Sequence, residues 1–226
     1  VRTWIESLQP PPENKQKLID VLSGIKAEDL EETLQQQSTK DVAAGPTNVS
    51  YIMLYNAPHK IRRLLWTILI CTTQNGITTN EMGRAAIKLI PKSLQRQRPI
   101  HLLETARKII GSTFSKRLLT RISRSLGNRI DPSYLSSFNF GFLPGTGTNE
   151  QLFLEQCILD HARINKKEIW RIMTDIKSAF PSVPIRAILT SVRALGLPDD
   201  VIHWINDLLT HRERYLQFDW GNSDEI

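Results

Sequence analysis

The sequence predicts an α+β fold in which helices dominate. Apolar residues recur at helical spacing over most of the chain, and short β-compatible runs occur in only a few places. Of the 226 residues, 40% are hydrophobic, which is enough to bury a substantial core. This hydrophobic content argues against disorder of the whole chain, and there are no internal repeats or low-complexity tracts.

The N-terminal part of the chain predicts helices separated by turns. A proline run at residues 10–12 precedes two short helical patterns rich in Glu and Gln, which indicate a solvated helical extension over residues 1–40. Gly45 interrupts the pattern. The run "YIMLYNAPHKIRRLLWTILICTTQNG" then predicts one buried helix that ends at Asn75 and Gly76.

The central part of the chain predicts a strand, a second extended segment and a basic helix. "AAIKLIPK" is apolar, β-compatible and closed by proline, which favours a strand. "RPIHLL" begins extended because a residue before proline is biased away from helix. From about Thr105 the apolar residues recur at helical spacing with basic residues between them, so one face packs and the other is cationic.

The C-terminal part predicts three helices and two strands after the glycine-rich loop "FNFGFLPGTGTNE". "QLFLEQCILDHARINK" is the first of these helices, "PIRAILTSVRALG" is a helix that stops at Gly196, and "DDVIHWINDLLTHR" is a helix capped by Asp199. "EIWRIMTDI" and "RYLQFDW" are interpreted as strands.

Positive charge is concentrated in the middle of the chain. Residues 84–130 contain twelve Lys or Arg against one acid, Glu104, which gives this stretch a net charge of +11. A solvated helix face usually mixes charges of both signs. The near absence of acids therefore favours a phosphate-bearing partner, bound independently of sequence and with steep salt dependence.

Cysteine usage and hydropathy predict an intracellular protein, in the cytoplasm or the nucleus. Cys71 and Cys157 lie in apolar surroundings and are too few for a disulfide framework, so they are interpreted as buried residues in a reducing compartment. The longest apolar run, "LLWTILIC", is too short to span a membrane. No signal sequence opens the chain, and no membrane association is expected.

Three blocks in order resemble the reverse transcriptases of non-LTR (LINE-type) retrotransposons, with group II intron enzymes as more distant relatives. "AAIKLIPKSLQRQRPIHLLETARKIIGSTFSKRL" is similar to the family's fingers hairpin and basic helix, and "FNFGFLPGTGT" to its Gly-Phe-x-Pro-Gly loop. "MTDIKSAFPSVP" resembles motif A of the palm, and "GLPDDVIHWI" follows it as the family's G-x-P-x-x-x-I-x-W-I pattern does. "KDVAAGPTNVS" is a degraded likeness of the family's entry motif, so the resemblance spans residues 40–220.

This resemblance implies the fingers and a partial palm of a right-hand polymerase. After the N-terminal helical extension (1–40), it implies a fingers-like region with the basic hairpin and helix (41–165) and a partial palm that contains motif A (166–226). The implied partners are an RNA template, a DNA primer and deoxynucleoside triphosphates, and the implied cofactor is Mg²⁺ in a two-metal site.

The resemblance also implies roles for individual residues. Asp175 is the catalytic and metal-binding carboxylate, and the backbone carbonyl of Ile176 is a further metal ligand. Phe180 lies beneath the incoming sugar and excludes a 2′-hydroxyl, although core packing is an alternative interpretation. The predicted triphosphate contacts are Arg98, Lys88 and Lys108. The predicted template-backbone contacts are Lys116, Arg117, Arg121 and Arg124.

The family's Tyr-x-Asp-Asp motif, which supplies the other metal carboxylates, is not found in the sequence. One carboxylate cannot hold two metals, so we expect no polymerisation by this chain alone. The leading hypothesis is therefore part of an RNA-directed DNA polymerase, as a fragment or a decayed retroelement copy. A non-catalytic nucleic-acid-binding module that uses residues 105–129 is the alternative, and a helical domain for protein partners is the third hypothesis.

Overall fold

The computed structural model describes residues 16–40, 42–93, 96–122, 139–143, 145–177, 179–210, 213–218 and 221–224. The chain forms two compact units. Unit 1 comprises residues 1–121 and 185–226, and unit 2 comprises residues 122–184. These units group the residues differently from the functional regions predicted above, because residues 185–226 pack with the N-terminal half of the chain. The three predicted regions remain a prediction.

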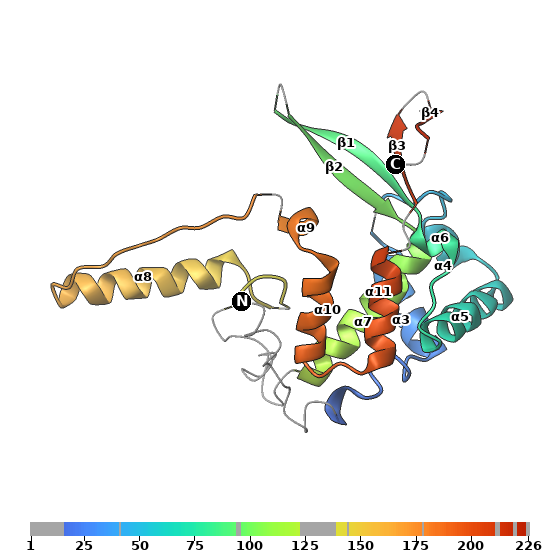
Figure 1. Cartoon of the computed structure of the whole chain (residues 1–226), viewed down its shortest axis with the longest axis horizontal. Coiled ribbons are helices and arrows are strands. Elements are labelled where there is room, and N and C mark those ends of the chain that lie inside the picture. Colours follow the sequence, from blue (N-terminus) through green and yellow to red (C-terminus); the bar gives the residue numbers. More distant parts are fainter. Residues whose placement is uncertain are drawn as a thin grey trace. The chain divides into compact units, whose positions relative to one another are not determined.

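Unit 1 combines helices with a small mixed sheet (Figure 1). Its helices are α3 (Ala27–Gln37), α4 (Tyr51–Asn56), α5 (His59–Gln74), α6 (Asn80–Gly83), α7 (Thr105–Ile122), α10 (Ile185–Ala194) and α11 (Asp199–Thr210). Its strands are β1 (Ala85–Ser93), β2 (Arg96–Leu103), β3 (Arg214–Phe218) and β4 (Gly221–Asn222). The strand order is β2-β1-β3-β4, with β1 antiparallel to β2 and parallel to β3. The prediction of a helix-rich α+β chain is confirmed.

The expected long helix at residues 51–76 is two helices. Pro58 separates α4 from α5, and Ala57 before it is extended, with φ −66° and ψ 149°. Proline disfavours the helical conformation of the preceding residue and has no N–H to donate, which explains the break. The predicted end is confirmed, because Asn75 caps α5 and Gly76 follows at φ 67° in the left-handed region.

The core of unit 1 lies where α3, α5, α7 and α11 meet. Trp66 of α5 and Trp204 of α11 are both 2% exposed, and the ring of Phe114 on α7 meets Trp204 edge-on at 5.3 Å. Trp66 also donates its indole N–H to Glu31 of α3 at 2.7 Å. Each of these four helices therefore buries apolar side chains in the core of unit 1.

The N-terminal segment is part of this core. Leu18 and Val21 are fully buried, as are Leu30 and Leu34 of α3. A side chain is fully buried only where other residues pack closely around it. The predicted solvated extension is thus an integral part of unit 1 from residue 16 onward.

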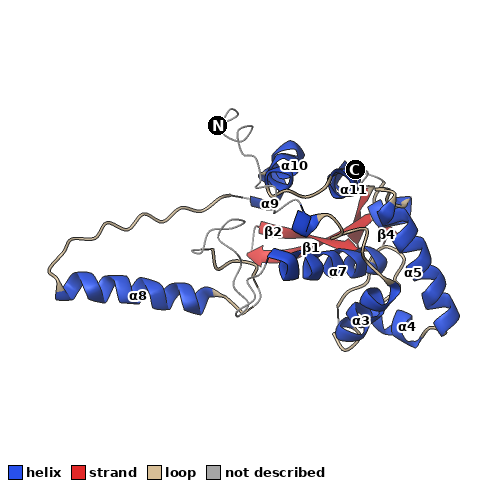
Figure 2. Ribbon diagram, turned by 90° about the horizontal axis from the view of Figure 1, so that it is seen from below, coloured by secondary structure: helices blue, strands red, loops and turns tan. Residues whose placement is uncertain are grey.

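The described part of unit 2 contains the glycine-rich loop (139–143 and 145–147), α8 (Thr148–Ile164), an extended segment at residues 167–176 and the short α9 (Ala179–Ser182). Figures 1 and 2 both show the extended segment running beside α8. An ion pair of 2.8 Å between Arg171 and Glu155 of α8 joins the two. Trp170 is 89% exposed.

Three expectations about local structure were wrong. "EIWRIMTDI" is extended but is not a strand, because no described segment of unit 2 lies beside it as a hydrogen-bonding partner. Cys71 and Cys157 are exposed rather than buried, because each lies on the outward side of its helix. Asp199 is the first residue of α11 rather than a cap before it, and its carboxylate lies near the positive end of the helix dipole.

Within the ranges that the structure describes, no helix is both long enough and apolar enough to cross a membrane.

Candidate active site

The β1–β2 hairpin presents two cations on one face. Lys88 pairs in register with Ile100, and Ile90 pairs with Arg98, so Lys88 and Arg98 are diagonal neighbours on the same side of the sheet. Such neighbours lie roughly 7–8 Å apart. Both side chains are exposed, and neither forms an ion pair or a hydrogen bond with any described residue. An anion with several oxygens, such as a phosphate chain, can therefore contact both.

Lys108 does not join this pair of cations. Its ammonium group donates to the carbonyl of Ala43 at 2.8 Å and lies 5.2 Å from the centre of the Tyr51 ring. Burial lowers the pKa of Lys108, and the nearby Glu104 carboxylate opposes that shift. Lys108 thus holds the segment around Ala43 against α7, and its predicted contact with the triphosphate stays a prediction.

Three of the predicted template-binding cations are already paired within unit 1. Lys116 contacts Glu32 at 2.7 Å, Arg117 contacts Asp29 at 3.3 Å, and Arg121 contacts Asp20 at 2.9 Å. Arg117 also donates to the carbonyl oxygens of Val21 and Asp20. The fourth, Arg124, lies outside the described residues.

The acids that form these pairs were not predicted from the sequence. The signal was the acidic character of residues 20–32, which contain Asp20, Asp29 and Glu32 together with Glu28 and Glu31. An acidic helix facing a basic helix predicts ion pairs between them when both belong to one core. Template binding by the α7 cations stays a prediction, and it requires these pairs to open.

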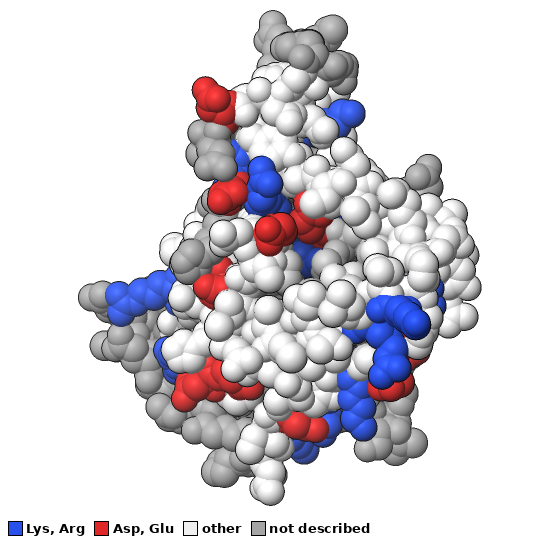
Figure 3. Space-filling view, turned by 90° about the vertical axis from the view of Figure 1, so that its right-hand side faces the viewer, with Lys and Arg blue, Asp and Glu red and all other residues white. Residues whose placement is uncertain are grey.

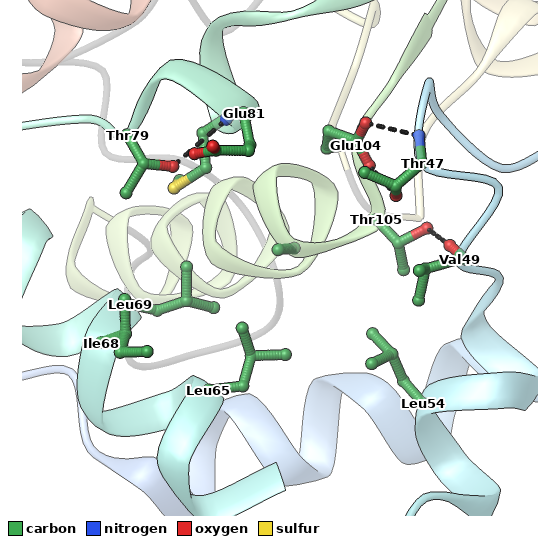
Figure 4. Close-up of a pocket in the computed structure, with 12 residues that line it drawn as sticks. Thr47, Val49, Leu54, Leu65, Ile68, Leu69, Thr79, Glu81, Glu104 and Thr105 are labelled. Atoms are coloured by element: carbon green, nitrogen blue, oxygen red, sulfur yellow. Dashed lines mark hydrogen bonds between the residues drawn. The ribbon is translucent and has the colours of Figure 1, made fainter. Parts of the chain in front are cut away.

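The segment that resembles the family's entry motif is locked onto the junction between β2 and α7. Thr47 donates its backbone N–H and its hydroxyl to the two carboxylate oxygens of Glu104, at 2.9 and 2.6 Å. Thr105, the first residue of α7, donates its hydroxyl to the carbonyl of Val49. Glu104, the one acid of the basic stretch, is therefore a structural residue that is 5% exposed (Figure 4).

Asp175 lies in the extended segment of unit 2. Its carboxylate is exposed and has no partner among the described residues, and Ile176 after it is also exposed. The ring of Phe180 is 82% exposed and meets the ring of Phe142 edge-on at 6.1 Å. This contact brings the glycine-rich loop and motif A, two of the blocks that carry the resemblance, side by side in unit 2.

The described residues do not complete a metal site. Asp175 offers hard carboxylate oxygens of the kind that Mg²⁺ prefers, with the Ile176 carbonyl adjacent in sequence. No group of three or more His, Cys, Asp or Glu side chains that could hold a metal ion occurs in the described part of the chain. The Asp175 carboxylate is therefore chemically suited to bind a metal ion, but the described residues supply too few ligands to complete a site.

Residues 90–225 match the family model of the reverse transcriptase (RNA-dependent DNA polymerase), which covers more than half of the chain. The chain belongs to the reverse transcriptase family. The matched region contains Arg98, the glycine-rich loop and motif A. Reverse transcriptases in general use divalent metals and act on RNA, DNA and deoxynucleoside triphosphates. No curated protein matches the chain.

Replacing Asp175 by alanine is expected to change the free energy of unfolding by less than about 0.5 kcal/mol, because its exposed carboxylate has no partner among the described residues. Salt-dependent binding of nucleic acid should also be unchanged. Urea unfolding and anisotropy titrations with a labelled primer-template measure both quantities.

The matched control for this change is Asp29→Ala. The Asp29 carboxylate accepts from the backbone N–H of Lys26 at 2.9 Å and from Arg117, so its loss should cost about 1–2 kcal/mol. A cost for Asp175→Ala as large as that of the control would show that Asp175 is a structural residue.

Proposed function

We propose that these residues form the fingers and the first part of the palm of a retroelement reverse transcriptase of the non-LTR type. In this proposal Arg98 and Lys88 bind the triphosphate of the incoming nucleotide. Asp175 and the carbonyl of Ile176 contribute to a Mg²⁺ site, and Phe180 packs against the sugar. The match to the reverse transcriptase family supports the class of reaction.

The exposed cationic face of the β1–β2 hairpin is the strongest support for this proposal. In the described part of the α7 basic helix, Lys108, Lys116, Arg117 and Arg121 are all engaged with other groups of unit 1. Lys88 and Arg98 are exposed, and their side chains have no partner among the described residues. A guanidinium fork and an ammonium group on a two-stranded support suit a chain of phosphates.

Arg98→Ala is expected to weaken the binding of a deoxynucleoside triphosphate about tenfold, because a charge-assisted hydrogen bond contributes roughly 1.5–3 kcal/mol and this one is exposed to solvent. Titration of a fluorescent deoxynucleoside triphosphate, repeated at several salt concentrations, measures the effect. The corresponding deoxynucleoside, which has no phosphates, should show no difference between the two proteins.

Arg63→Ala is the matched control, because Arg63 is also an exposed arginine without a partner among the described residues but lies on α5. It should leave triphosphate binding unchanged. Equal losses for the two variants would mean that the chain attracts the nucleotide by net charge alone and would contradict a site on the hairpin.

We also propose that nucleotidyl transfer needs carboxylates beyond those described here. Asp175 alone cannot hold two metal ions about 4 Å apart. The 226-residue chain with Mg²⁺, a primer-template and deoxynucleoside triphosphates should therefore extend no primer. Template-dependent synthesis by this chain would refute the proposal, and the Asp175→Ala variant would then identify whether motif A is involved.

The alternative is a retroelement-derived module that binds nucleic acid without chemistry. The exposed hairpin cations also support this function, because phosphate contacts do not require a metal. The two functions differ in their response to nucleotide. A polymerase site binds the triphosphate through Arg98 in preference to the nucleic acid backbone, whereas a simple binding module loses affinity for both ligands when Arg98 is replaced.

A further inference from the structure

Helix α5 carries an apolar stripe on its outward side. The stripe consists of Ile61, Leu64, Ile68 and Cys71, all of them exposed. Their spacing of three, four and three residues is that of the a and d positions of a coiled coil. Trp66, Leu69 and Thr73 bury the opposite side of the same helix in the core. Helix α5 is therefore apolar on two sides, and the core uses only one of them.

A cavity adjoins the stripe on one flank. It has a volume of about 330 Å³ and is lined by Leu54 of α4 and by Leu65, Ile68 and Leu69 of α5, with Glu81 and Glu104 on its other side (Figure 4). Ile68 belongs to both the cavity and the stripe. A side chain that projects from a partner could fill this cavity while its neighbours lie along the stripe.

Cations lie along the other flank. Successive residues of an α-helix are about 100° apart around its axis. Lys60 and Arg63 each precede a stripe residue and so lie on one side of the stripe. Leu65 follows the stripe residue Leu64 and so lies on the other side, towards the cavity. Both cations are exposed and unpaired among the described residues. The sequence contains no Asp or Glu from residue 42 to residue 80. Figure 3 views the molecule from the side on which α5 lies in Figure 1 and shows a broad uncharged area, with Lys and Arg side chains at one edge and Asp and Glu side chains at others.

We propose that the α5 stripe is the docking site for an amphipathic helix of a protein partner. That helix places one apolar side chain in the cavity and carboxylates opposite Lys60 and Arg63. The spacing of the stripe suits a helix as the partner. The cavity favours a partner with a projecting side chain over a membrane surface. A second copy of the chain fits poorly, because α5 has cations but no acid to pair with them.

This interaction is separate from the hairpin and motif A, so its failure would leave the proposed catalytic role untouched. Two labelled 21-residue helical peptides test it against the 226-residue chain. Both carry leucines at a and d positions; one has glutamates on one flank, and the other has lysines there. Fluorescence anisotropy should show that the glutamate peptide binds at least about tenfold more tightly than the lysine peptide.

Variants then locate the site. Leu64→Glu should weaken binding of the glutamate peptide at least about tenfold, because a charge replaces an apolar contact on the stripe. Ile19→Glu is the matched control: Leu64 is 60% exposed and Ile19 is 64% exposed, so neither change disturbs the core. The double variant Lys60→Glu, Arg63→Glu should instead prefer the lysine peptide.

The proposal is overturned by equal affinity for the two peptides, by no binding of either, or by equal losses in Leu64→Glu and Ile19→Glu. It is also overturned if light scattering finds a dimer that Leu64→Glu dissociates, because a second copy would then occupy the stripe. Binding of the chain to vesicles of mixed phosphatidylcholine and phosphatidylserine that Leu64→Glu abolishes would assign the stripe to a membrane surface and likewise refute a helical partner.

Discussion

Replacing Gly45 by alanine is expected to lower the free energy of unfolding by about 3 kcal/mol. A Cβ atom at this position would lie 2.6 Å from the N and Cα atoms of Glu104 and 2.7 Å from the carbonyl carbon of Leu103. These are backbone atoms at the junction of β2 and α7 and cannot move aside. The loop must shift, which adds the cost of overpacking to the loss of the Thr47 hydrogen bonds to Glu104.

Gly111→Ala is the matched control for this change. Gly111 lies inside α7 with nothing within 4 Å of the added Cβ, and alanine favours a helix interior over glycine by about 0.5–1 kcal/mol. The same chemical change should therefore stabilise one site and destabilise the other in urea unfolding. A Gly45→Ala variant as stable as the parent would contradict the close packing of the entry segment.

Replacing Arg117 by methionine is expected to cost about 2 kcal/mol of stability. Methionine keeps an apolar stem but removes the donors to the carbonyls of Val21 and Asp20 and to the Asp29 carboxylate. The Arg117 side chain is only 22% exposed, so these acceptors lose partners that water replaces poorly. Primer-template binding by the folded protein should change little, because this guanidinium faces the N-terminal segment.

Arg121→Met is the matched control, because it removes a surface ion pair rather than the largely buried contacts of Arg117. Arg121 contacts Asp20 at 2.9 Å but is 41% exposed, so its loss should cost about 0.5 kcal/mol or less. Anisotropy titrations of both variants at two salt concentrations measure the nucleic acid contacts. A marked loss of primer-template binding by Arg117→Met at unchanged stability would support the template role that the sequence predicts for this residue.

The strands and helices near the hairpin followed from local patterns. The proline in "AAIKLIPK", the extended residue before Pro99 and the helical period from Thr105 each depend on neighbouring residues only, and β1, β2 and α7 form where they predict. The break at Pro58 was equally local and was missed, because the apolar run on both sides of it reads as one helix. A residue before proline was the available signal.

The partners of charged residues did not follow from local patterns. Lys116, Arg117 and Arg121 of α7 have acidic partners about 80 to 100 positions earlier in the chain. Counting charges within a short stretch cannot reveal such partners, so these residues were predicted to form an unpaired cationic face. "EIWRIMTDI" shows the same limit for strands. Its β propensity is local, but a strand needs hydrogen bonds from a neighbour, and no described part of unit 2 supplies them.

Motifs and periodicity are properties of neighbouring residues, so the reverse transcriptase resemblance, the helix-rich α+β class and the position of Lys88 and Arg98 on one hairpin could be predicted from the sequence. The tertiary structure decided which cations are free. Glu32, Asp29 and Asp20 pair with the cations of α7, and the carbonyl of Ala43 accepts from Lys108. Lys88 and Arg98 stay exposed, because ion pairing depends on which distant segments the core brings together.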